Sequence, residues 1–286
     1  MAANDTFIIV DGNIYRSDEQ LFNHNNRSFC FGDGLFESMH AYGTDVQLFN
    51  LHFERLTNGI KALKMQPDKS FTPAAISKQI THLLNKNKLF TGARVKVILF
   101  RKDGGRFLPE TNDFSYIIET KQLEQPYYLL NKKGCSIEIF KDITKTASSI
   151  SSFKTTSSAI YVMASIFAHE NGYDDCLILN QKQELIESCN SNLFVVKNNV
   201  LLTPAADSGC VSGVMRRYLM TIAKEAGINV IDNIPITESI LLEADEIFLT
   251  NAISGIRWVQ AFRNRRYYNA MSQNLIKLLN KSVFGV

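Results

Sequence analysis

Short apolar or alternating segments dominate the first part of the chain and predict strands. Residues 6–16 predict a hairpin, because Asp11-Gly12 separates two such segments and Asp-Gly is a preferred two-residue turn. Residues 93–100 and 114–120 also alternate or run apolar, as strands do. We expect all of these segments to belong to one N-terminal domain.

Two helices are predicted between these strands. Apolar residues recur at helical spacing within residues 48–65, and Pro73 stands where the first turn of a second helix begins. That second helix is expected to run to about Lys88. Before both helices, two glycines around Asp33 lead into another strand-like run. Strands and helices together predict an α/β domain over residues 1–121.

A polar stretch containing a proline interrupts this pattern at residues 122–134, and we place the domain linker there. Beyond it, residues 135–286 predict short strands separated by turn residues, with a few covering helices. This combination favours an α+β domain built on a barrel-like sheet. Three helices are predicted here: one that ends near Asn171, one over residues 213–227 and one at the end of the chain. The predicted strands are 136–140, 176–180, 184–187, 192–196, 200–203, 245–251 and 255–262.

The composition is that of an ordinary globular protein, with 286 residues, 45% hydrophobic and 21% charged, and a formal net charge of +3. The densest basic clusters, at 85–88 and 263–266, are short, so we expect no nucleic-acid partner. No apolar run approaches the roughly 20 residues of a membrane span. The N-terminal residues 1–13 lack the basic and long apolar regions of a secretion signal.

The cysteines and histidines argue against a disulfide framework and against a metal site. The cysteines are odd in number and widely spaced, without a CxxC pair, which favours reduced thiols in the cytoplasm. The histidines are isolated, so we expect them to be structural or exposed and the protein to need no metal. These residues are Cys30, Cys135, Cys176, Cys189 and Cys210, and His24, His40, His52, His82 and His169.

Lys154 is the first candidate for covalent chemistry. It lies among small hydroxyl-bearing residues beside Phe153, and it is the only charged residue between Ile150 and Ala168. An amine that is poorly solvated and has no neighbouring carboxylate more readily takes its nucleophilic neutral form. An exposed lysine in a polar loop would explain this segment as well.

Glu187 and a helix start at Gly213 supply two further parts of a possible cofactor site. Glu187 follows an apolar run and precedes small residues, so its carboxylate could pair with a pyridine nitrogen and keep it protonated. The step Ser212-Gly213 begins a helix whose first amides, including those of Val214 and Met215, suit a phosphate. A solvent-exposed glutamate and an ordinary helix start are the simpler readings.

Two residues elsewhere could contact the same phosphate. Arg55 could offer a charged fork and Thr250 a hydroxyl, although each is also typical of a surface helix or a strand end. A reactive lysine, a phosphate site and a buried carboxylate are together what pyridoxal phosphate chemistry needs from a protein. The interpretation is therefore an enzyme.

These residues occur in an order that closely resembles one family. The patterns ExxxxNLF at 187–194, LxT at 201–203 and VxGVMR at 211–216 are similar to those of the class IV aminotransferases. That group of fold-type IV pyridoxal-phosphate enzymes includes branched-chain aminotransferases, D-amino-acid aminotransferases and aminodeoxychorismate lyases. FGDGLFES, HFERL, DDCLILN and ADEIFLTNA follow the family order as well, so the resemblance covers about Asp11 to Val259.

The resemblance implies two domains with pyridoxal 5'-phosphate between them, and a homodimer whose subunits help to close each other's sites. Lys154 would form the Schiff base and later move the proton between substrate and cofactor, while Glu187 would pair with the pyridinium nitrogen. The residues implied to bind the phosphate are Arg55, Val214, Met215, Thr250 and Asn251, and those implied to shape the substrate pocket are Phe31, Phe36 and Glu37.

The motifs that distinguish the family members do not all favour the same member. Branched-chain enzymes usually carry Gly-Gly-Asn-Tyr after the lysine, and Ala159 stands where that tyrosine belongs, with Tyr161 nearby. The Arg-x-His pair of D-amino-acid aminotransferases is also missing, since the strand region offers Arg101 and Arg106 without such a histidine. SNLF and GVMR favour the lyase and D-enzyme branches.

We expect an aminotransferase that acts on a small or branched-chain amino acid. The alternative is 4-amino-4-deoxychorismate lyase, which releases pyruvate and p-aminobenzoate for folate synthesis. A second alternative is a protein that binds the cofactor without turnover. Either enzyme would take a small-molecule substrate, with no nucleic acid or membrane as partner.

Overall fold

A computed structural model describes residues 6–286. The first five residues, which belong to the expected domain 1–121 and to the segment tested for a secretion signal, lie outside the described part. The chain divides into two compact units: unit 1 contains the residues up to Tyr127 together with Phe153–Ser157, and unit 2 contains Tyr128–Ser152 and Ser158–Val286. The division between Tyr127 and Tyr128 lies inside the stretch expected to be the linker, residues 122–134.

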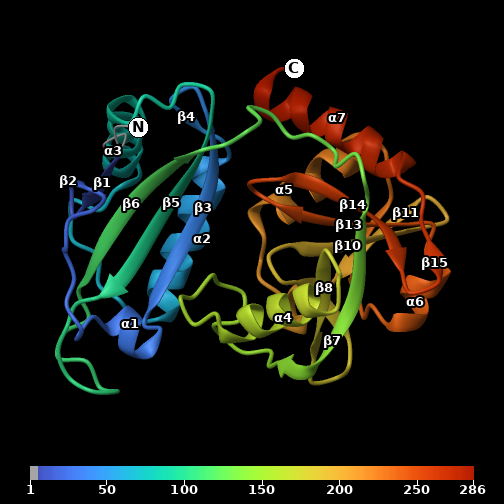
Figure 1. Ribbon diagram of the computed structural model, residues 1–286, viewed down its shortest axis with the longest axis horizontal. Helices are drawn as coiled ribbons and strands as arrows, with labels where there is room; N and C mark the ends of the chain where they lie inside the picture. The colour runs from blue at the N-terminus through green and yellow to red at the C-terminus, as the bar shows by residue number, and fades with distance from the viewer. Residues whose placement is uncertain (1–5) are drawn as a thin grey trace. The chain divides into compact units, whose positions relative to one another are not determined.

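Unit 1 is an antiparallel sheet with helices packed against it (Figure 1). Its strands are β1 (Phe7–Val10), β2 (Asn13–Arg16), β3 (Gly34–Tyr42), β4 (Asp45–Val46), β5 (Gly92–Arg101) and β6 (Phe114–Gln122), and its helices are α1 (Arg27–Phe31), α2 (Phe49–Ala62) and α3 (Pro73–Lys86). The strand order is β2-β1-β6-β5-β3-β4. The predicted hairpin is confirmed, and both turn residues, Asp11 and Gly12, have positive φ as a type I′ turn requires.

The two longer helices of unit 1 form where the sequence predicts them. Thr72 caps α3 by accepting a hydrogen bond from the amide of Ala75, and Pro73 occupies the first turn, where a missing N–H costs nothing. Four apolar residues on one face of α3 are buried against the sheet: Ile76, Ile80, Leu83 and Leu84. Each contributes about 1.5–3 kcal/mol by leaving water.

The segment Phe153–Ser157 packs as part of unit 1. The sequence placed it in the domain 135–286, and the structure corrects this assignment. Thr155 pairs with Leu35 of β3, and the amide of Phe36 donates to the carbonyl of Lys154 over 2.8 Å. Phe153 packs on the hydrophobic core of unit 1. The segment thus extends the sheet by a short strand-like stretch, which local sequence patterns do not reveal.

Unit 2 is a sheet that closes on itself. Its strands are β7 (Cys135–Lys145), β8 (Asp175–Asn180), β9 (Leu185–Ser188), β10 (Asn192–Lys197), β11 (Val200–Pro204), β12 (Val230–Ile234), β13 (Glu246–Asn251), β14 (Gly255–Phe262) and β15 (Arg265–Arg266). The path β10-β13-β14-β7-β8-β9 returns to β10 through the pair Asn192–Glu187. This closed six-stranded ring confirms the predicted barrel-like sheet.

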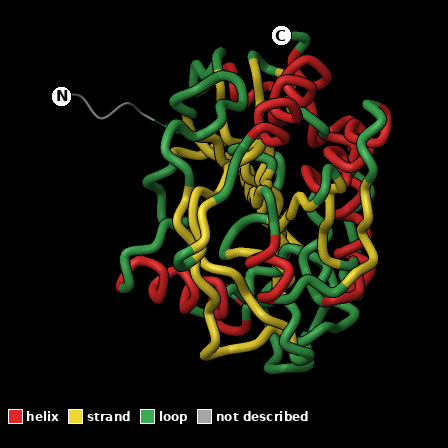
Figure 2. Tube along the Cα trace, turned by 90° about the vertical axis from the view of Figure 1, so that its right-hand side faces the viewer, coloured by secondary structure: helices red, strands yellow, loops and turns green. Residues whose placement is uncertain are grey.

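Helices cover the barrel of unit 2, and irregular segments join them (green in Figure 2). They are α4 (Ala159–Glu170), the 3-10 turn η1 (Ala206–Ser208), α5 (Val214–Glu225), α6 (Glu238–Glu243) and α7 (Ala270–Phe284). Helix α4 packs against β7 and β8, whereas α5 packs against β13 and α7. The predicted helix over 213–227 is therefore confirmed as α5.

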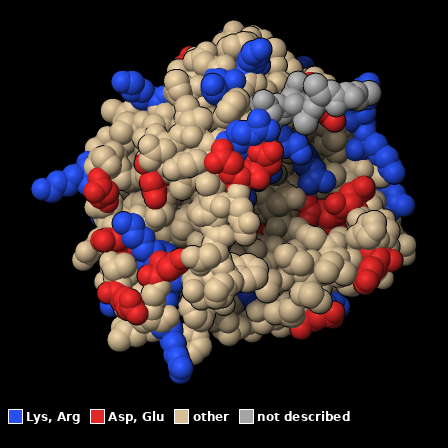
Figure 3. Space-filling view, turned by 60° about the vertical axis from the view of Figure 1, so that its left-hand side comes forward, with Lys and Arg blue, Asp and Glu red and all other residues tan. Residues whose placement is uncertain are grey.

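Charged side chains of both signs are interspersed on the face that Figure 3 shows, without a continuous basic patch there. Within residues 6–286, no helix combines the length and the apolar character needed to cross a bilayer. In the same part of the chain, no three His, Cys, Asp or Glu side chains converge as metal ligands would.

Candidate functional site

The candidate residues fall into two groups, one in each unit. Unit 1 holds the proposed Schiff-base lysine, the arginine and the three residues expected to shape the substrate pocket: Lys154, Arg55, Phe31, Phe36 and Glu37. Unit 2 holds the proposed pyridine partner and the remaining phosphate ligands: Glu187, Val214, Met215, Thr250 and Asn251. Strands and helices carry all of these residues except Lys154, which lies in the segment Phe153–Ser157.

Lys154 lies directly opposite Phe36 across the short strand pairing with β3. The backbone bonds Phe36 N–H to Lys154 O and Thr156 N–H to Gly34 O flank the Thr155–Leu35 pair and set Lys154 opposite Phe36. Residues that face each other across an antiparallel pair project to the same side of the sheet. Accordingly, Lys154 Nζ lies over the Phe36 ring, 4.6 Å from its centroid, a cation–π distance. The backbone therefore fixes both the position and the direction of the lysine.

Glu37 is buried and bound on both carboxylate oxygens. Arg55 donates from Nε to Oε1 over 2.7 Å and from Nη2 to Oε2 over 2.6 Å, a bidentate ion pair. His52 Nδ1 lies 2.7 Å from Oε2. Glu37 was expected in the substrate pocket, and its contacts within unit 1 are instead with two residues of α2. It holds the guanidinium of Arg55 in a fixed plane.

The titration of this cluster follows from its burial and its charges. Burial alone would raise the pKa of Glu37, but Arg55 and His52 outweigh it and bring the pKa from 4.5 to about 2. Burial lowers the pKa of His52, which the Glu37 carboxylate opposes in part. At neutral pH, an ionised Glu37 therefore faces Arg55 and a neutral His52 that donates its Nδ1 proton.

Phe31 ends α1 and remains 43% exposed. Its ring lies 5.7 Å from that of Phe107 and under the guanidinium of Arg27, 4.9 Å away. Arg27 is held in turn by Asp33 and by two backbone carbonyls of the 104–106 loop. An aromatic side chain on such an anchored helix end remains available to shape a pocket.

In unit 2, Glu187, Asn192 and Thr250 form one row across three strands. Asn192 of β10 pairs with Glu187 of β9 on one side and with Thr250 of β13 on the other. The next row on the same face as Asn192 and Thr250 contains Phe194 and Phe248, whose rings stack with centroids 5.1 Å apart. Helix α5 packs against this part of the barrel.

Glu187 is only 3% exposed and accepts three hydrogen bonds. Lys145 Nζ and the Tyr161 hydroxyl donate to Oε1 over 2.7 and 2.8 Å, and the amide of Val211 donates to Oε2 over 2.8 Å. A carboxylate has about four acceptor positions. These contacts use three of them, and the position that remains belongs to Oε2.

The start of α5 and Thr250 suit an anion. No side chain caps the helix at Gly213, and its first turn holds no acidic residue. Its first amides, including those of Val214 and Met215, have no partner within the helix. The Thr250 hydroxyl is buried without a hydrogen-bond partner in the part of the chain that the structure describes. An orphaned buried hydroxyl is costly unless a ligand satisfies it.

Asn192 places the helix start beside this row. Its Nδ2 donates to the carbonyl of Val211 over 2.8 Å. A Cβ at Gly213 would stand 1.8 Å from Asn192 Oδ1, so only glycine fits. Further along the motif, the buried Arg216 donates to Thr203 Oγ1 and to the carbonyl of Pro204. Part of the sequence motif is therefore an anchor that fixes α5 to the barrel.

Asn251 shapes the turn after β13. Its Oδ1 accepts from the amides of Ile253 and Ser254, and its Nδ2 donates to Ser191 Oγ over 3.0 Å. The side chain thus connects the end of β13 to the turn that follows Glu187.

Sequence reasoning missed Lys145, Tyr161 and Asn192, and treated His52 as an isolated histidine. His52 had a signal, because it precedes Arg55 by three residues and so shares its face of α2. Tyr161 lay near the lysine, but its bond to Glu187 depends on the packing of α4. Asn192 had a partial signal, because it is the asparagine of the ExxxxNLF motif. Lys145 had none, since only the tertiary structure brings the end of β7 to Glu187.

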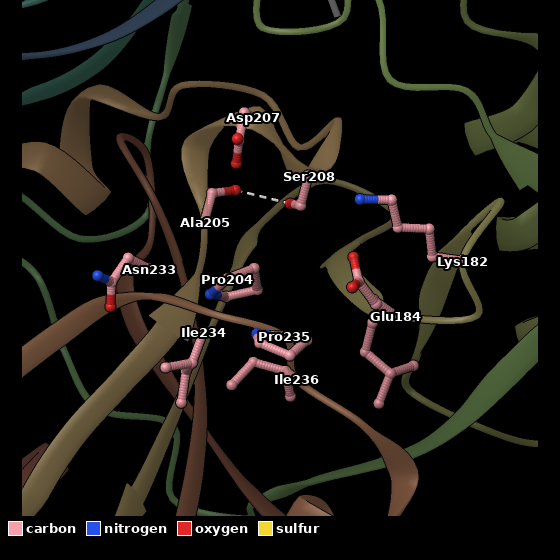
Figure 4. A pocket seen from close by; sticks show the side chains of 11 residues that line it. Lys182, Glu184, Pro204, Ala205, Asp207, Ser208, Asn233, Ile234, Pro235 and Ile236 are labelled. Atoms are coloured by element: carbon pink, nitrogen blue, oxygen red, sulfur yellow. Dashed lines mark hydrogen bonds between the residues drawn. The ribbon is translucent and has the colours of Figure 1, made fainter.

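A cavity of about 180 Å³ lies elsewhere in unit 2 (Figure 4). It shares no residue with the candidate cofactor ligands and is smaller than the roughly 300–1,000 Å³ typical of small-molecule sites. The hydrogen-bonding pattern described above therefore locates the candidate site better than this cavity does. Its lining includes Lys182, Glu184, Pro204, Asp207 and Asn233.

The chain matches known proteins over most of its length. The family model described as amino-transferase class IV matches residues 34–262. A protein of Aquifex aeolicus named "Probable branched-chain-amino-acid aminotransferase" is 26% identical, with 98% of this chain and 91% of that protein covered. The aminodeoxychorismate lyase of Bacillus subtilis is also 26% identical, with 86% and 83% covered.

The fold has solved counterparts. A branched-chain aminotransferase from Thermoproteus uzoniensis, crystallised with norvaline, superimposes with a TM-score of 0.90. The match covers 98% of this chain and 95% of that one, at 22% sequence identity. This similarity concerns the fold of both units.

Proposed function

The chain belongs to the class IV aminotransferase family, and on that premise we propose that it is a pyridoxal 5'-phosphate-dependent aminotransferase acting on a small or branched-chain amino acid. One observation carries the proposal: the row Glu187–Asn192–Thr250 with the start of α5 fixed beside it. This row offers one acceptor for a ring nitrogen and a set of donors for a phosphate.

The residues of unit 2 fit the cofactor. The single acceptor position left on Glu187 matches the single N–H of a protonated pyridine ring. The buried Thr250 hydroxyl and the first amides of α5 match phosphate oxygens. Asn251, at the end of β13, would hold the turn beside that phosphate. These features support the assignment of Glu187, Val214, Met215, Thr250 and Asn251 as cofactor ligands.

In unit 1, we assign Lys154 as the residue that binds the cofactor covalently and moves the proton at the substrate α-carbon. When bound, pyridoxal phosphate supplies an electron sink for that carbon. Arg55, held in plane by Glu37, would give the phosphate a fixed guanidinium edge. Phe36 would cover Lys154 and limit access of water, and Phe31 would contact the substrate.

Aminodeoxychorismate lyase is the second candidate. Ala159 replaces the tyrosine usual in branched-chain enzymes, and the hydroxyl of the nearby Tyr161 donates to Glu187. The Bacillus subtilis lyase and the Aquifex protein have the same sequence identity to this chain. Both reactions begin with removal of the same proton, so the residues named so far serve either one.

A visible spectrum with added amino acids tests both proposals. We expect the purified protein with added cofactor to show the absorption band of lysine-bound pyridoxal phosphate. L-leucine or L-glutamate should convert it to the pyridoxamine form, and D-alanine tests the other stereochemistry. Pyruvate released from aminodeoxychorismate, without conversion by amino acids, would establish the lyase. A band that no substrate changes would mean binding without turnover, and no band would refute the assignment.

Lys154→Ala is the matching variant. It should remove the band and all turnover while the thermal unfolding midpoint stays close to that of the wild type, because the backbone bonds around residue 154 remain. Lys78→Ala, on the exposed face of α3, is the control and should change neither. A Lys154→Ala protein that keeps most of its activity would contradict the assigned role.

We also propose a homodimer in the cytoplasm. Three apolar side chains of α4 are about half exposed, Val162, Met163 and Ile166, and a second copy of the chain would bury them. Five free cysteines suit a reducing compartment. Light scattering of the purified protein should give twice the mass of the chain, and Ile166→Lys should lower it. A monomeric wild type would contradict the dimer.

A further inference from the structure

Unit 2 contains two thiols in contact that the proposed reaction does not use. Cys176 on β8 and Cys189, just after β9, have Sγ atoms 3.4 Å apart. The β8–β9 register pairs Ile178 with Glu187 and Leu177 with Ser188, so Cys176 and Cys189 are the next cross-strand neighbours. The two cysteines are well separated in the sequence and do not form a CxxC motif.

The backbone geometry of this position suits a disulfide. Residues opposite each other in an antiparallel pair have Cα atoms about 4.5–5.5 Å apart, inside the range of about 4.4–6.8 Å that disulfides span. A bond of about 2.05 Å would require the sulfurs, which lie 3.4 Å apart, to approach by about 1.4 Å. The amide of Cys189 also donates to Asp175 Oδ1 over 3.2 Å, which fixes its backbone.

The two thiols differ in exposure. Cys176 is fully buried, and its Sγ contacts the carbonyl of Ala164 over 3.0 Å. Cys189 is partly exposed. The Cys176 thiol lowers the pKa of Cys189, against the opposing effects of burial and of the Asp175 carboxylate. The exposed thiol is thus the one that an oxidant reaches, and the buried one is placed to resolve it.

We propose that Cys176 and Cys189 form an oxidant-sensitive dithiol that closes to a disulfide and restrains the turn after Glu187. A hydroperoxide is the oxidant. The Cys189 sulfur attacks one peroxide oxygen, the O–O bond breaks, and a sulfenic acid and an alcohol or water form. The Cys176 sulfur then attacks the sulfenic sulfur and releases water, so two thiols lose two electrons and two protons in total.

The disulfide would act on the turn 188–191, which lies next to the row of candidate ligands. Ser188 N–H donates to the carbonyl of Ser191 across this turn, and Ser191 Oγ accepts from Asn251. Ser188 Oγ donates to Asp175 Oδ2 over 3.2 Å. A covalent link at Cys189 would stiffen this network on the side nearest Glu187.

Thiol counting tests the site without reference to the cofactor. The exposed Cys30 is first replaced, Cys30→Ser, which leaves four thiols of the five. After hydrogen peroxide, denatured protein should titrate two thiols, and dithiothreitol should restore four. Peptide mass spectrometry without reductant should find Cys176 linked to Cys189. Four remaining thiols, or a link between any other pair, would overturn the proposal.

Two variants and one dynamic measurement complete the test. In Cys176→Ser, peroxide should leave Cys189 as a sulfenic acid that dimedone traps, whereas Cys135→Ser should still lose two thiols. Amide hydrogen exchange at residues 188–191 should slow on oxidation in Cys30→Ser and not in Cys176→Ser. Unchanged exchange in the oxidised protein would refute the restraint. These outcomes stay interpretable even if the proposed aminotransferase function is wrong.

Discussion

At the scale of single residues, a buried carboxylate organises the candidate residues within each unit. Glu37 binds Arg55 and His52, and Glu187 binds Lys145, Tyr161 and the Val211 amide. Buried carboxylates persist only when several donors compensate for lost hydration. Both fulfil this condition, and each carboxylate accepts three of about four possible hydrogen bonds; the acceptor position left on Glu187 lies in the unit that also holds the proposed phosphate ligands.

The role of Glu187 leads to a kinetic prediction. Glu187→Gln removes the charge that would hold a pyridinium nitrogen, so single-turnover conversion of the substrate should slow by about 100-fold or more. Stopped-flow absorbance of the cofactor band measures this rate. Glu243→Gln is the control, because it breaks an exposed pair with Lys197 and should leave the rate unchanged. An unaltered rate in Glu187→Gln would exclude it from the proposed role.

For Glu37 the prediction concerns stability. Glu37→Gln leaves Arg55, whose side chain is only 10% exposed, without its counter-charge, and removing one partner of a buried pair costs about 3–5 kcal/mol. Denaturant unfolding followed by far-UV circular dichroism should show this loss. Glu119→Gln in the same sheet removes a partly exposed partner of Lys96 at 3.6 Å and should cost less than about 1 kcal/mol. Equal effects of the two variants would contradict the prediction.

At the scale of elements, the start of α5 depends on a contact between a strand and a loop. Asn192 on β10 binds the carbonyl of Val211 and lies against Gly213, so strand and helix are positioned together. The predicted boundaries of α5 needed only the sequence, whereas its direction relative to Glu187 is decided by Asn192. The short helix α1 was not predicted, because five residues capped by Asn26 show no helical periodicity.

The contact between Asn192 and Gly213 predicts the effect of adding one methyl group at residue 213. Gly213→Ala would bring a Cβ to 1.8 Å from Asn192 Oδ1, so the loop must shift away from the barrel. The dissociation constant for pyridoxal phosphate, from absorbance titration, should rise by at least about tenfold, equivalent to about 1.4 kcal/mol. Adding Asn192→Gly removes the clash and should recover part of the affinity. Unchanged affinity in Gly213→Ala would show that phosphate binds elsewhere.

At the scale of the whole molecule, two buried histidines and the tryptophan that serves as a fluorescence probe lie in different units. Burial lowers the pKa of His40 from 6.5 to about 4, and it lowers the pKa of His52 as well; both lie in unit 1. The only tryptophan, Trp258, lies in unit 2, where its Nε1 donates to the carbonyl of Asn131. Tryptophan fluorescence therefore reports on unit 2, and circular dichroism on both units.

Acid should weaken unit 1 first. Between pH 6.5 and about 4 the unfolded chain binds protons that folded His40 does not, so the free energy of unfolding falls as the pH falls, by up to about 3 kcal/mol for this residue. Glu37, with a pKa of about 2, adds its own loss only as the pH falls from 4.5 toward 2. As the pH is lowered, the denaturant midpoint measured by circular dichroism should shift more than the midpoint measured by Trp258 fluorescence.

Two histidine variants test whether His40 causes this pH dependence of the free energy of unfolding. His40→Gln should flatten the pH dependence between 6.5 and 4 even if it lowers stability overall, whereas His82→Gln, on the exposed face of α3, should keep it. A pH-independent midpoint in the wild type would show that the buried histidines do not control acid stability.

Most strands and the longer helices could be predicted from sequence, because hydrophobic periodicity, Pro73 and the Asp11-Gly12 turn act over neighbouring residues. The barrel-like sheet followed from many short strands, and the family from an ordered set of motifs. The candidate residues Lys154, Glu187 and Thr250 could be named for the same reason, since their types and order are local properties of the chain.

Only the tertiary structure decided what those residues contact. Strand pairing placed Lys154 opposite Phe36 and made its segment part of unit 1, and barrel closure brought Glu187, Asn192 and Thr250 into one row. Packing turned Glu37 toward Arg55 and gave Glu187 the ammonium of Lys145 as partner. These contacts join residues far apart in the chain, and their energies depend on burial and exact pairing, which no local pattern of residue types encodes.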